Sequence, residues 1–475
     1  MRKGIRLIAS VLTGAIFMLN LGIVSYAAES VTYLSEEEIQ KQKEDGTEKT
    51  AEEIKEELLA KARALPVETN ELKNWPKGPE ICGESGIVMD MDNGAILYGK
   101  SIDKKYYPAS ITKIMTALVA LENSEMTDLV TFSENSIQCQ RSGYAHIAMK
   151  SGEQITMRDA LHAMMLASAN EVAYAIGETV GGTHENFVKM MNDCARKLGC
   201  ENTNFVNTNG IFDENHYVSA RDMALIAKAA FSKSELLDIM QTSEYTIPAT
   251  NLEDETRTFQ QKHKMMVQGK YYDQRCIGGK TGYTDLSYNT LVTALEENGR
   301  RIVVVILGSR DETYENTKAM ADYAFQNFQQ ISIAENADVK ELTGIPENAS
   351  VTVPKGVTFQ ELDCEEDESE EITYSYQKNP VGTMTAKLTK EQKIELLQIQ
   401  KDDVQPDKED KEEKETWLTT EHIIMLVIVG ILILILLIVI LVVKVRKRRA
   451  RIKRRREMRR RRQQEMRRRN QRREF

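Results

Sequence analysis

The chain has 475 residues and a formal net charge of −9, and 41% of its residues are hydrophobic. Its six histidines form no HExxH or HxH pair, which excludes the usual ligand pattern of a zinc hydrolase. The sequence also has no Walker loop and no dinucleotide fingerprint, which excludes the nucleotide-dependent enzymes that carry them. We therefore expect neither a metal ion nor a cofactor.

The first residues have the pattern of a secretory signal. Three basic residues precede an uncharged apolar stretch over residues 7–24, and small residues follow at a suitable cleavage position. We expect residues 1–28 to be a signal peptide. Residues 29–74 are rich in charged and polar side chains, which predicts a charged tether that is partly helical over residues 35–64.

A Ser-x-x-Lys motif formed by Ser110 and Lys113 opens a run of apolar residues at helical spacing, which predicts a buried amphipathic helix. Residues three apart share a helix face, so the Lys113 amine can reach the Ser110 hydroxyl. A lysine whose pKa is lowered by burial or by a second cation such as Lys280 can deprotonate that serine. The alternative is a surface serine and lysine on an ordinary helix. A second match, formed by Ser101 and Lys104, lies in a charged stretch and is interpreted as a solvated turn.

Two further short motifs follow in the chain. Ser168 and Asn170 stand between two apolar helical runs, where they could pass a proton and hold a carbonyl, or else cap a helix. Lys280, Thr281 and Gly282 lie in a strand-like region, where they suit a terminal carboxylate, or else form a hairpin turn. The presence of all three motifs in this order argues against coincidence.

The three motifs and the residues around them resemble the D-alanyl-D-alanine carboxypeptidases, which are low-molecular-mass penicillin-binding proteins of the serine-type DD-peptidase family. The match extends over about residues 82–328. The resemblance implies an α/β (α+β) penicillin-recognising serine transferase fold, with an antiparallel sheet flanked by helices. It also implies removal of the terminal D-alanine from peptidoglycan stem pentapeptides through an acyl-enzyme, with β-lactams as covalent inhibitors.

The resemblance further implies roles for individual residues. Ser110 would be the acylated nucleophile and Lys113 its base, while Ser168 and Asn170 would serve proton transfer and substrate positioning. Lys280 and Thr281 would hold the terminal carboxylate, and the backbone N–H of Tyr283 would complete the oxyanion hole with that of Ser110. The substrate-binding set is then Lys280, Thr281, Gly282, Tyr283 and Arg310. Arg310 belongs to this set because some relatives carry an arginine after the last long strand.

Two other functions stay open on the sequence. A class A-like β-lactamase shares the three motifs and needs an extra glutamate, which Glu201 superficially supplies. However, the residues after Glu201 follow the carboxypeptidase pattern. A non-catalytic protein with the penicillin-binding fold would bind its ligand without turnover, and the complete motifs argue against it.

Composition divides the rest of the chain. We expect a DD-peptidase catalytic domain at 75–330, a small all-β domain of β-sandwich type at 331–400, which would act as a stalk, and a charged linker at 401–422. The strongly apolar residues 423–443 would form about 31 Å of helix, which predicts a single transmembrane helix. Residues 444–475 would form a basic cytoplasmic tail.

The basic tail contains 19 Lys or Arg and three Glu, so its net side-chain charge is +16. Because the net charge of the whole chain is −9, the residues before the tail carry −25. The positive-inside rule then predicts a single-pass cell membrane protein with an extracytoplasmic catalytic domain. We expect the basic tail to bind anionic lipids. It could also bind the phosphates of a nucleic acid through charge alone, and we expect no specific nucleic-acid site.

The six cysteines permit disulfides in an exported protein, but the sequence selects no pairing among them. Free thiols are equally compatible with it. Cys276, four residues before Lys280, could lie near the site.

Overall fold

The computed structural model describes residues 51–336, 342–343, 345–346, 348–366, 371–385 and 387–388. The predicted signal peptide, transmembrane helix and basic tail, and the predicted linker before that helix, lie outside these residues. Within the described ranges, no helix has both the length and the apolar character needed to cross a bilayer.

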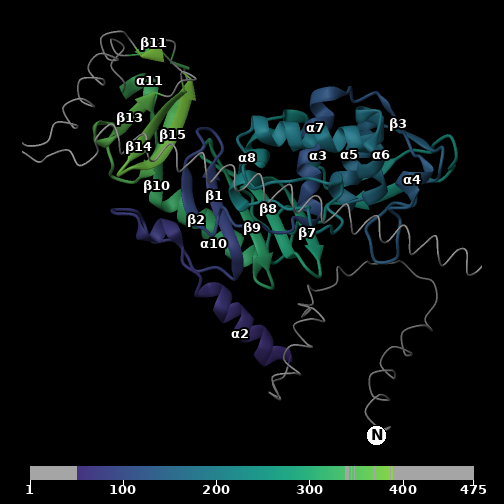
Figure 1. The fold of residues 1–475 in the computed structure, drawn as a ribbon, viewed down its shortest axis with the longest axis horizontal. Helices are drawn as coiled ribbons and strands as arrows, with labels where there is room; N and C mark the ends of the chain where they lie inside the picture. The colour runs from purple at the N-terminus through teal and green to yellow at the C-terminus, as the bar shows by residue number, and fades with distance from the viewer. Residues whose placement is uncertain are drawn as a thin grey trace, which may run out of the picture. The chain divides into compact units, whose positions relative to one another are not determined.

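A five-stranded antiparallel sheet forms the centre of the fold, in the strand order β2-β1-β9-β8-β7 (Figure 1). Two of its strands come from the start of the catalytic region and three from its end. Their bounds are β1 (Gly83–Asp90), β2 (Ile96–Lys100), β7 (Cys276–Thr284), β8 (Tyr288–Glu297) and β9 (Arg300–Ser309). Strand β7 lies at one edge of the sheet, so half of its backbone N–H and C=O groups have no neighbouring strand.

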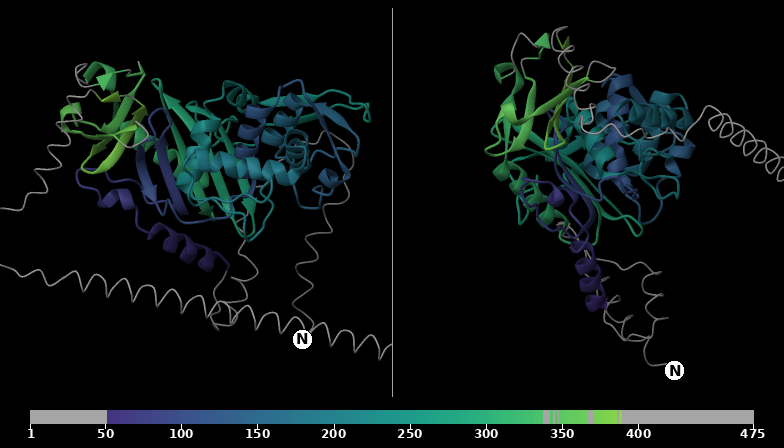
Figure 2. Two further views of the ribbon diagram at one scale, coloured as in Figure 1. Left: turned by 45° about the horizontal axis from the view of Figure 1, so that its top comes forward. Right: turned by 60° about the vertical axis from the view of Figure 1, so that its left-hand side comes forward.

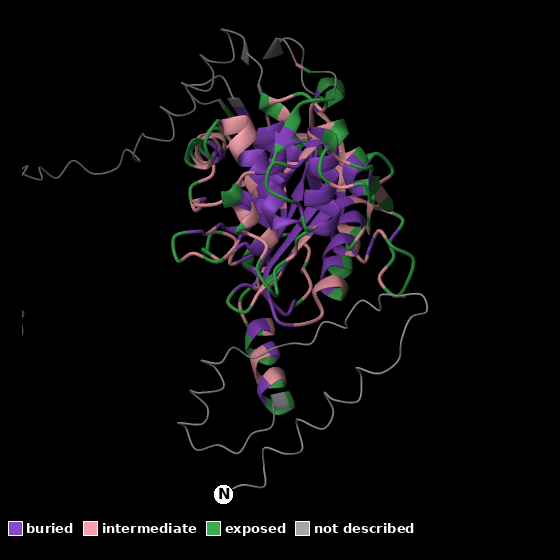
Figure 3. Ribbon diagram, turned by 90° about the vertical axis from the view of Figure 1, so that its right-hand side faces the viewer, coloured by how far each residue is buried: buried purple, intermediate pink, exposed green. Residues whose placement is uncertain are grey.

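Helices cover both faces of the sheet. In β9, alternate residues such as Val303 and Val305 join the core that packs on α8 (Ala220–Ala230). The residues between them, such as Val304, join a second core with α10 (Thr313–Asn327). Since both faces are buried, this strand is a continuous apolar run rather than an alternating one. Figure 3 shows the buried residues, in purple, gathered in the sheet and in the helices packed on it.

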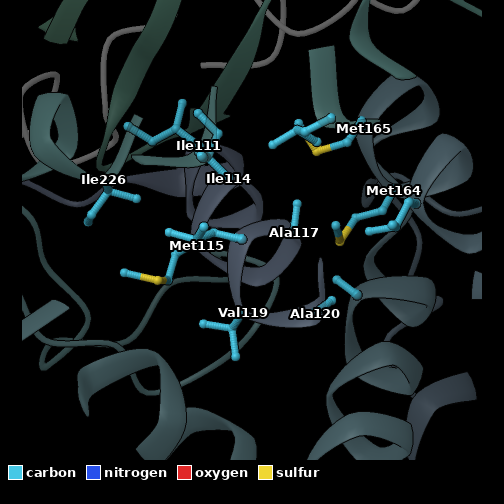
Figure 4. Close-up of a cluster of buried hydrophobic side chains, with 14 of the residues drawn as sticks. Ile111, Ile114, Met115, Ala117, Val119, Ala120, Met164, Met165 and Ile226 are labelled. Atoms are coloured by element: carbon cyan, nitrogen blue, oxygen red, sulfur yellow. The ribbon is translucent and has the colours of Figure 1, made fainter. Parts of the chain in front are cut away.

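Helix α3 (Thr112–Asn123) lies at the centre of the helical part of the molecule. Figure 4 shows its side chains pointing in several directions into the surrounding core, among them Ile114, Met115 and Val119. The sequence predicts an amphipathic helix with one apolar face, but α3 is buried on nearly all sides because further helices surround it. The helices that pack closely on it are α6 (Asn170–Gly181), α7 (His184–Lys197) and α8. Helices α4 (Glu134–Ile137), α5 (Met157–His162) and α9 (Ser234–Gln241) also belong to this part of the molecule. Two two-stranded antiparallel sheets complete this part: β3 (Leu129–Thr131) with β4 (Gln154–Thr156), and β5 (Glu244–Ile247) with β6 (Arg257–Gln260).

Small sheets follow the catalytic region, in agreement with the expected all-β character (Figure 2). The described elements are β10 (Phe328–Ser332), α11 (Ile333–Asn336), β11 (Leu342–Thr343), β12 (Ser350–Pro354), β13 (Asp363–Glu366), β14 (Glu371–Tyr376), β15 (Asn379–Thr385) and β16 (Lys387–Leu388). A buried polar contact joins them to the central sheet, since the Thr352 hydroxyl donates to the Asp90 carboxylate at 2.7 Å. The amide of Asn93 donates to the same hydroxyl at 2.9 Å.

The end of the predicted tether is a helix, α2 (Ala51–Arg63), which is seen in purple below the sheet in Figure 1. It packs on the body of the protein through the buried side chains of Ile54, Leu59 and Ala62. The buried Lys100 amine donates to the Ala62 carbonyl at 2.7 Å and so binds the carboxyl end of this helix. Composition predicts the helical character of this segment, but it does not predict the docking.

Candidate active site

A pocket of about 390 Å³ lies beside the edge strand β7, and residues of all three motifs line it. Ser110 comes from the turn before α3, and Thr281 and Gly282 come from β7. Asn170 is the first residue of α6, and Ser168 precedes that helix. These segments are far apart in the sequence. The fold therefore brings together the groups that the motifs predict.

The Lys113 amine is the centre of the hydrogen-bond network. It lies 3.0 Å from the Ser110 hydroxyl, and it donates to the Asn170 side-chain oxygen and to the Asn209 carbonyl, both at 2.7 Å. Burial lowers the pKa of Lys113 well below its ordinary value, and the charge of Lys280 lowers it further. A neutral amine at this distance can accept the serine proton.

Two glycines allow backbone segments to approach the serine closely. A Cβ atom on Gly210, whose φ is +85°, would lie 1.8 Å from the Ala109 carbonyl oxygen. One on Gly282 would lie 2.9 Å from the Ser110 backbone nitrogen. Gly282 thus lets β7 itself lie against Ser110.

Ser168 and Asn170 follow a short π-helical segment, a feature often found at functional sites. Ser168 has a φ of +63°, in the left-handed region that is strained for a residue other than glycine. Helix α6 has no side-chain cap, and the side-chain oxygen of Asn170 instead accepts from Lys113. The helix-cap interpretation of this motif is therefore wrong for Asn170.

A second lysine lies buried behind the pocket. Lys280 is 3% exposed and donates to the Thr281 carbonyl at 2.9 Å. Burial lowers the pKa of Lys280 to about 7, and the charge of Lys262 contributes to this decrease.

Lys262 is a pocket residue that the sequence analysis missed. Its amine donates to the Ala167 carbonyl at 2.9 Å, directly before Ser168. None of the three lysines Lys113, Lys262 and Lys280 forms an ion pair with a carboxylate in the described part of the chain. No local motif marks Lys262, because its position follows from the path of the chain between β6 and β7.

Arg310 lies apart from the residues that line the pocket. Its guanidinium pairs with Glu84 at 2.8 Å and stacks 3.9 Å from the centre of the Tyr288 ring, and the residue is not among those that line the pocket. Tyr283, by contrast, lines the pocket and is 42% exposed. The five residues after Arg310 line the pocket instead, since the chain turns into α10 at this point.

Two open questions from the sequence meet the structure here. Glu201 is exposed and does not line the pocket, so it cannot serve as the extra active-site glutamate that a class A-like β-lactamase needs. None of the six cysteines forms a disulfide in the described part of the chain, and Cys276 is half-buried in β7. The Cys139 thiol contacts the hydrogen-bond network of Lys113, because its sulfur accepts from the side-chain amide of Asn209 at 3.8 Å.

Comparison with known proteins identifies the family. The model of a family described as D-alanyl-D-alanine carboxypeptidase matches residues 72–311, which is half of the chain. The chain belongs to this family. The predicted resemblance is confirmed.

Curated relatives support this assignment. The chain is 32% identical to the D-alanyl-D-alanine carboxypeptidase DacF of Bacillus subtilis over 257 residues, which cover 52% of this chain and 63% of that protein. It is 29% identical to DacA of Haemophilus influenzae over 284 residues, 57% of this chain and 69% of that protein. The chain thus spans about two thirds of the length of these relatives.

A solved structure shows the same fold. Penicillin binding protein 5 from Haemophilus influenzae superposes with a TM-score of 0.54 and 23% sequence identity, over 66% of this chain and 98% of that chain. The antiparallel sheet flanked by helices is therefore the penicillin-binding protein fold, as predicted.

The lysine cluster gives a direct test. In the Lys262→Gln protein we expect the midpoint for protonation of Lys280 to rise above its value of about 7, because a neighbouring like charge has been removed. The pKa of Lys113 should rise in the same direction. NMR titration of ¹³C-labelled lysine side chains measures both. Lys270→Gln is the control, since the Lys270 side chain is 73% exposed and pairs with Glu315. An unchanged Lys280 midpoint would contradict this account of the cluster.

Proposed function

We propose that the protein is a serine-type D-Ala-D-Ala carboxypeptidase that removes the terminal D-alanine from peptidoglycan stem pentapeptides. The observation that carries this proposal is the distance of 3.0 Å between the Lys113 amine and the Ser110 hydroxyl, at the edge of a pocket that also contains the other two motifs. Family membership supports the same reaction. β-Lactams would acylate the same serine.

In the acylation step, Ser110 attacks the carbonyl carbon of the penultimate D-alanine while its proton passes to Lys113. The Ser110 and Tyr283 backbone N–H groups would hold the resulting oxyanion. The bond to the terminal D-alanine nitrogen then breaks. The leaving amine takes a proton from Lys113, with the Ser168 hydroxyl as a relay.

In the deacylation step, a water molecule attacks the ester on Ser110. Lys113 again accepts a proton, and it returns this proton to the serine oxygen as the ester breaks. The products are the shortened peptide with a new carboxylate and the free serine. Asn170 would keep the lysine amine in place through both steps, because its oxygen accepts a hydrogen bond from that amine.

The preference for a terminal residue would come from charge. A substrate that ends in D-alanine carries a carboxylate. Lys262 lines the pocket and Lys280 lies buried behind it, and neither forms an ion pair with a carboxylate in the described residues. Thr281 would add a hydroxyl donor. The substrate backbone would pair with the open edge of β7, as peptides do with exposed sheet edges.

Substitution of the nucleophile tests the proposal. Full-length Ser110→Ala protein should release no D-alanine from a muramyl pentapeptide that ends in D-Ala-D-Ala, and Lys113→Ala should slow release by about 10²-fold or more, as loss of a general base does. Chromatography of free D-alanine and the mass of the peptide measure both. Ser101→Ala, in the second Ser-x-x-Lys match, is the control that should stay active. Rapid hydrolysis of penicillin with an intact peptide would instead indicate a β-lactamase, and no turnover of either would indicate a binding protein.

We further infer that the protein is anchored in the cell membrane by one helix at 423–443, with the catalytic domain outside and the basic residues 444–475 in the cytoplasm. Sequence composition supports this topology: the helix segment is uncharged, and the tail that follows it carries +16. A signal peptide at 1–28 would export the catalytic domain, and a stalk at 331–400 would hold it away from the bilayer. Anionic lipids would bind the tail.

Protease treatment of intact cells tests this topology. External protease should remove the catalytic domain and leave a fragment that contains the tail, as detected by antibodies against each part. The same treatment of inverted membrane vesicles should give the reverse pattern. Protection of the catalytic domain in intact cells would refute the topology.

A further inference from the structure

Helix α2 is tied to the wall of the pocket, although it lies before residue 72, where the family match begins. Its Lys55 amine pairs with the Asp311 carboxylate at 2.6 Å. Its Arg63 guanidinium pairs with the Glu312 carboxylate at 2.8 Å. Both acidic residues line the pocket. A segment outside the family domain thus contacts the substrate site.

The docking of α2 is specific. Three of its side chains are buried against the body, and Lys100 binds its last turn through the Ala62 carbonyl. The carboxyl end of a helix carries partial negative charge, so a buried cation stabilises it there. Lys55 lies in the first half of the helix and Arg63 at its end, and the two ion pairs fix the helix at two points along the pocket wall.

The pocket wall contacted by α2 is acidic. Asp311, Glu312 and Glu315 all line the pocket, and Glu315 pairs with Lys270 from the chain before β7. Although burial opposes it, the hydrogen bond from Lys55 holds the pKa of Asp311 below its usual value. Hydrogen bonds from the Cys82 thiol and from Arg63 hold the pKa of Glu312 low. These groups therefore stay ionised, and only neighbouring cations can offset their charge.

This charge matters for a site that receives an anion. A negative group near a bound carboxylate weakens binding, by an amount that depends on distance and on exposure to solvent. With both ion pairs in place, the charges of Asp311 and Glu312 are offset, and they oppose less strongly the attraction of a bound carboxylate to Lys262, which lines the same pocket.

We propose that α2 is an electrostatic positioning element of the substrate site, in which Lys55 and Arg63 offset the charge of Asp311 and Glu312 and so set the affinity for a substrate carboxylate. The inference rests on the proposed carboxypeptidase function. Lys55 and Arg63 are positioning residues, because they act through the two carboxylates of the wall. Docking of a helix outside the family domain thereby controls the affinity for substrate.

A double-mutant cycle on full-length protein in detergent tests this inference. Lys55→Ala should raise KM for a pentapeptide that ends in D-Ala-D-Ala by about threefold to tenfold, with kcat changed less than about twofold, because an uncompensated carboxylate then faces the pocket. Lys55→Ala should have no further effect in the Asp311→Asn background. Lys55→Arg should restore the wild-type KM. Added salt should narrow the difference between Lys55→Ala and wild type, because it screens the exposed carboxylate.

Lys61→Ala is the matched control, since Lys61 lies on the same helix, is 68% exposed and pairs only with Glu57 of α2 in the described ion pairs. Thermal denaturation of every variant identifies any loss of folding. An equal rise of KM in the Asp311→Asn background, or a rise that salt does not reduce, would overturn the inference while the proposed function stands. An inactive wild-type protein would instead overturn the proposed function, and the inference with it.

Discussion

The hydrogen bonds of the buried Lys113 amine are the constraint on which the rest of the site depends. This amine reaches Ser110, Asn170 and Asn209, which come from three separate parts of the chain. A buried amine without a carboxylate partner is costly when charged, so the fold favours its neutral form, the form that can act as a base. Dense packing around α3 and the close approach allowed by Gly210 and Gly282 maintain this geometry. The structure thus gives up some stability at the site where it needs a reactive group.

Local patterns predicted most of the site. Ser110 and Lys113 are one helical turn apart, so their contact follows from spacing alone, and the apolar run of β9 follows from burial on both faces. Lys262 and the acidic wall after Arg310 were missed because their places depend on how distant segments cross. The role predicted for Arg310 stays a prediction: this side chain pairs with Glu84, and the turn into α10 brings the residues after it to the pocket. The docking of α2 depends on contacts across more than two hundred residues, which composition cannot indicate.

The charges around the pocket form two groups with opposite signs. On one side are three lysines that form no ion pair with a carboxylate in the described residues. Beside the effect of burial, the charges of Lys280 and Lys262 lower the pKa of Lys113, and the charge of Lys262 lowers that of Lys280. On the other side, each carboxylate of the wall pairs with a cation outside the pocket. An anionic substrate would therefore meet positive charge on the side of Lys262, which lines the pocket, and carboxylates already paired with cations on the side of the wall. This arrangement connects the acid–base chemistry of the site to its choice of substrate.

The most direct test of the central claim, that Ser110 is the activated nucleophile, is mass spectrometry of the full-length protein after incubation with penicillin, followed by peptide mapping. The account predicts one covalent adduct per chain, located on the peptide that contains Ser110, and formed much more slowly when Lys113 is replaced by alanine. An adduct on another serine, or no adduct with a correctly folded protein, would contradict it.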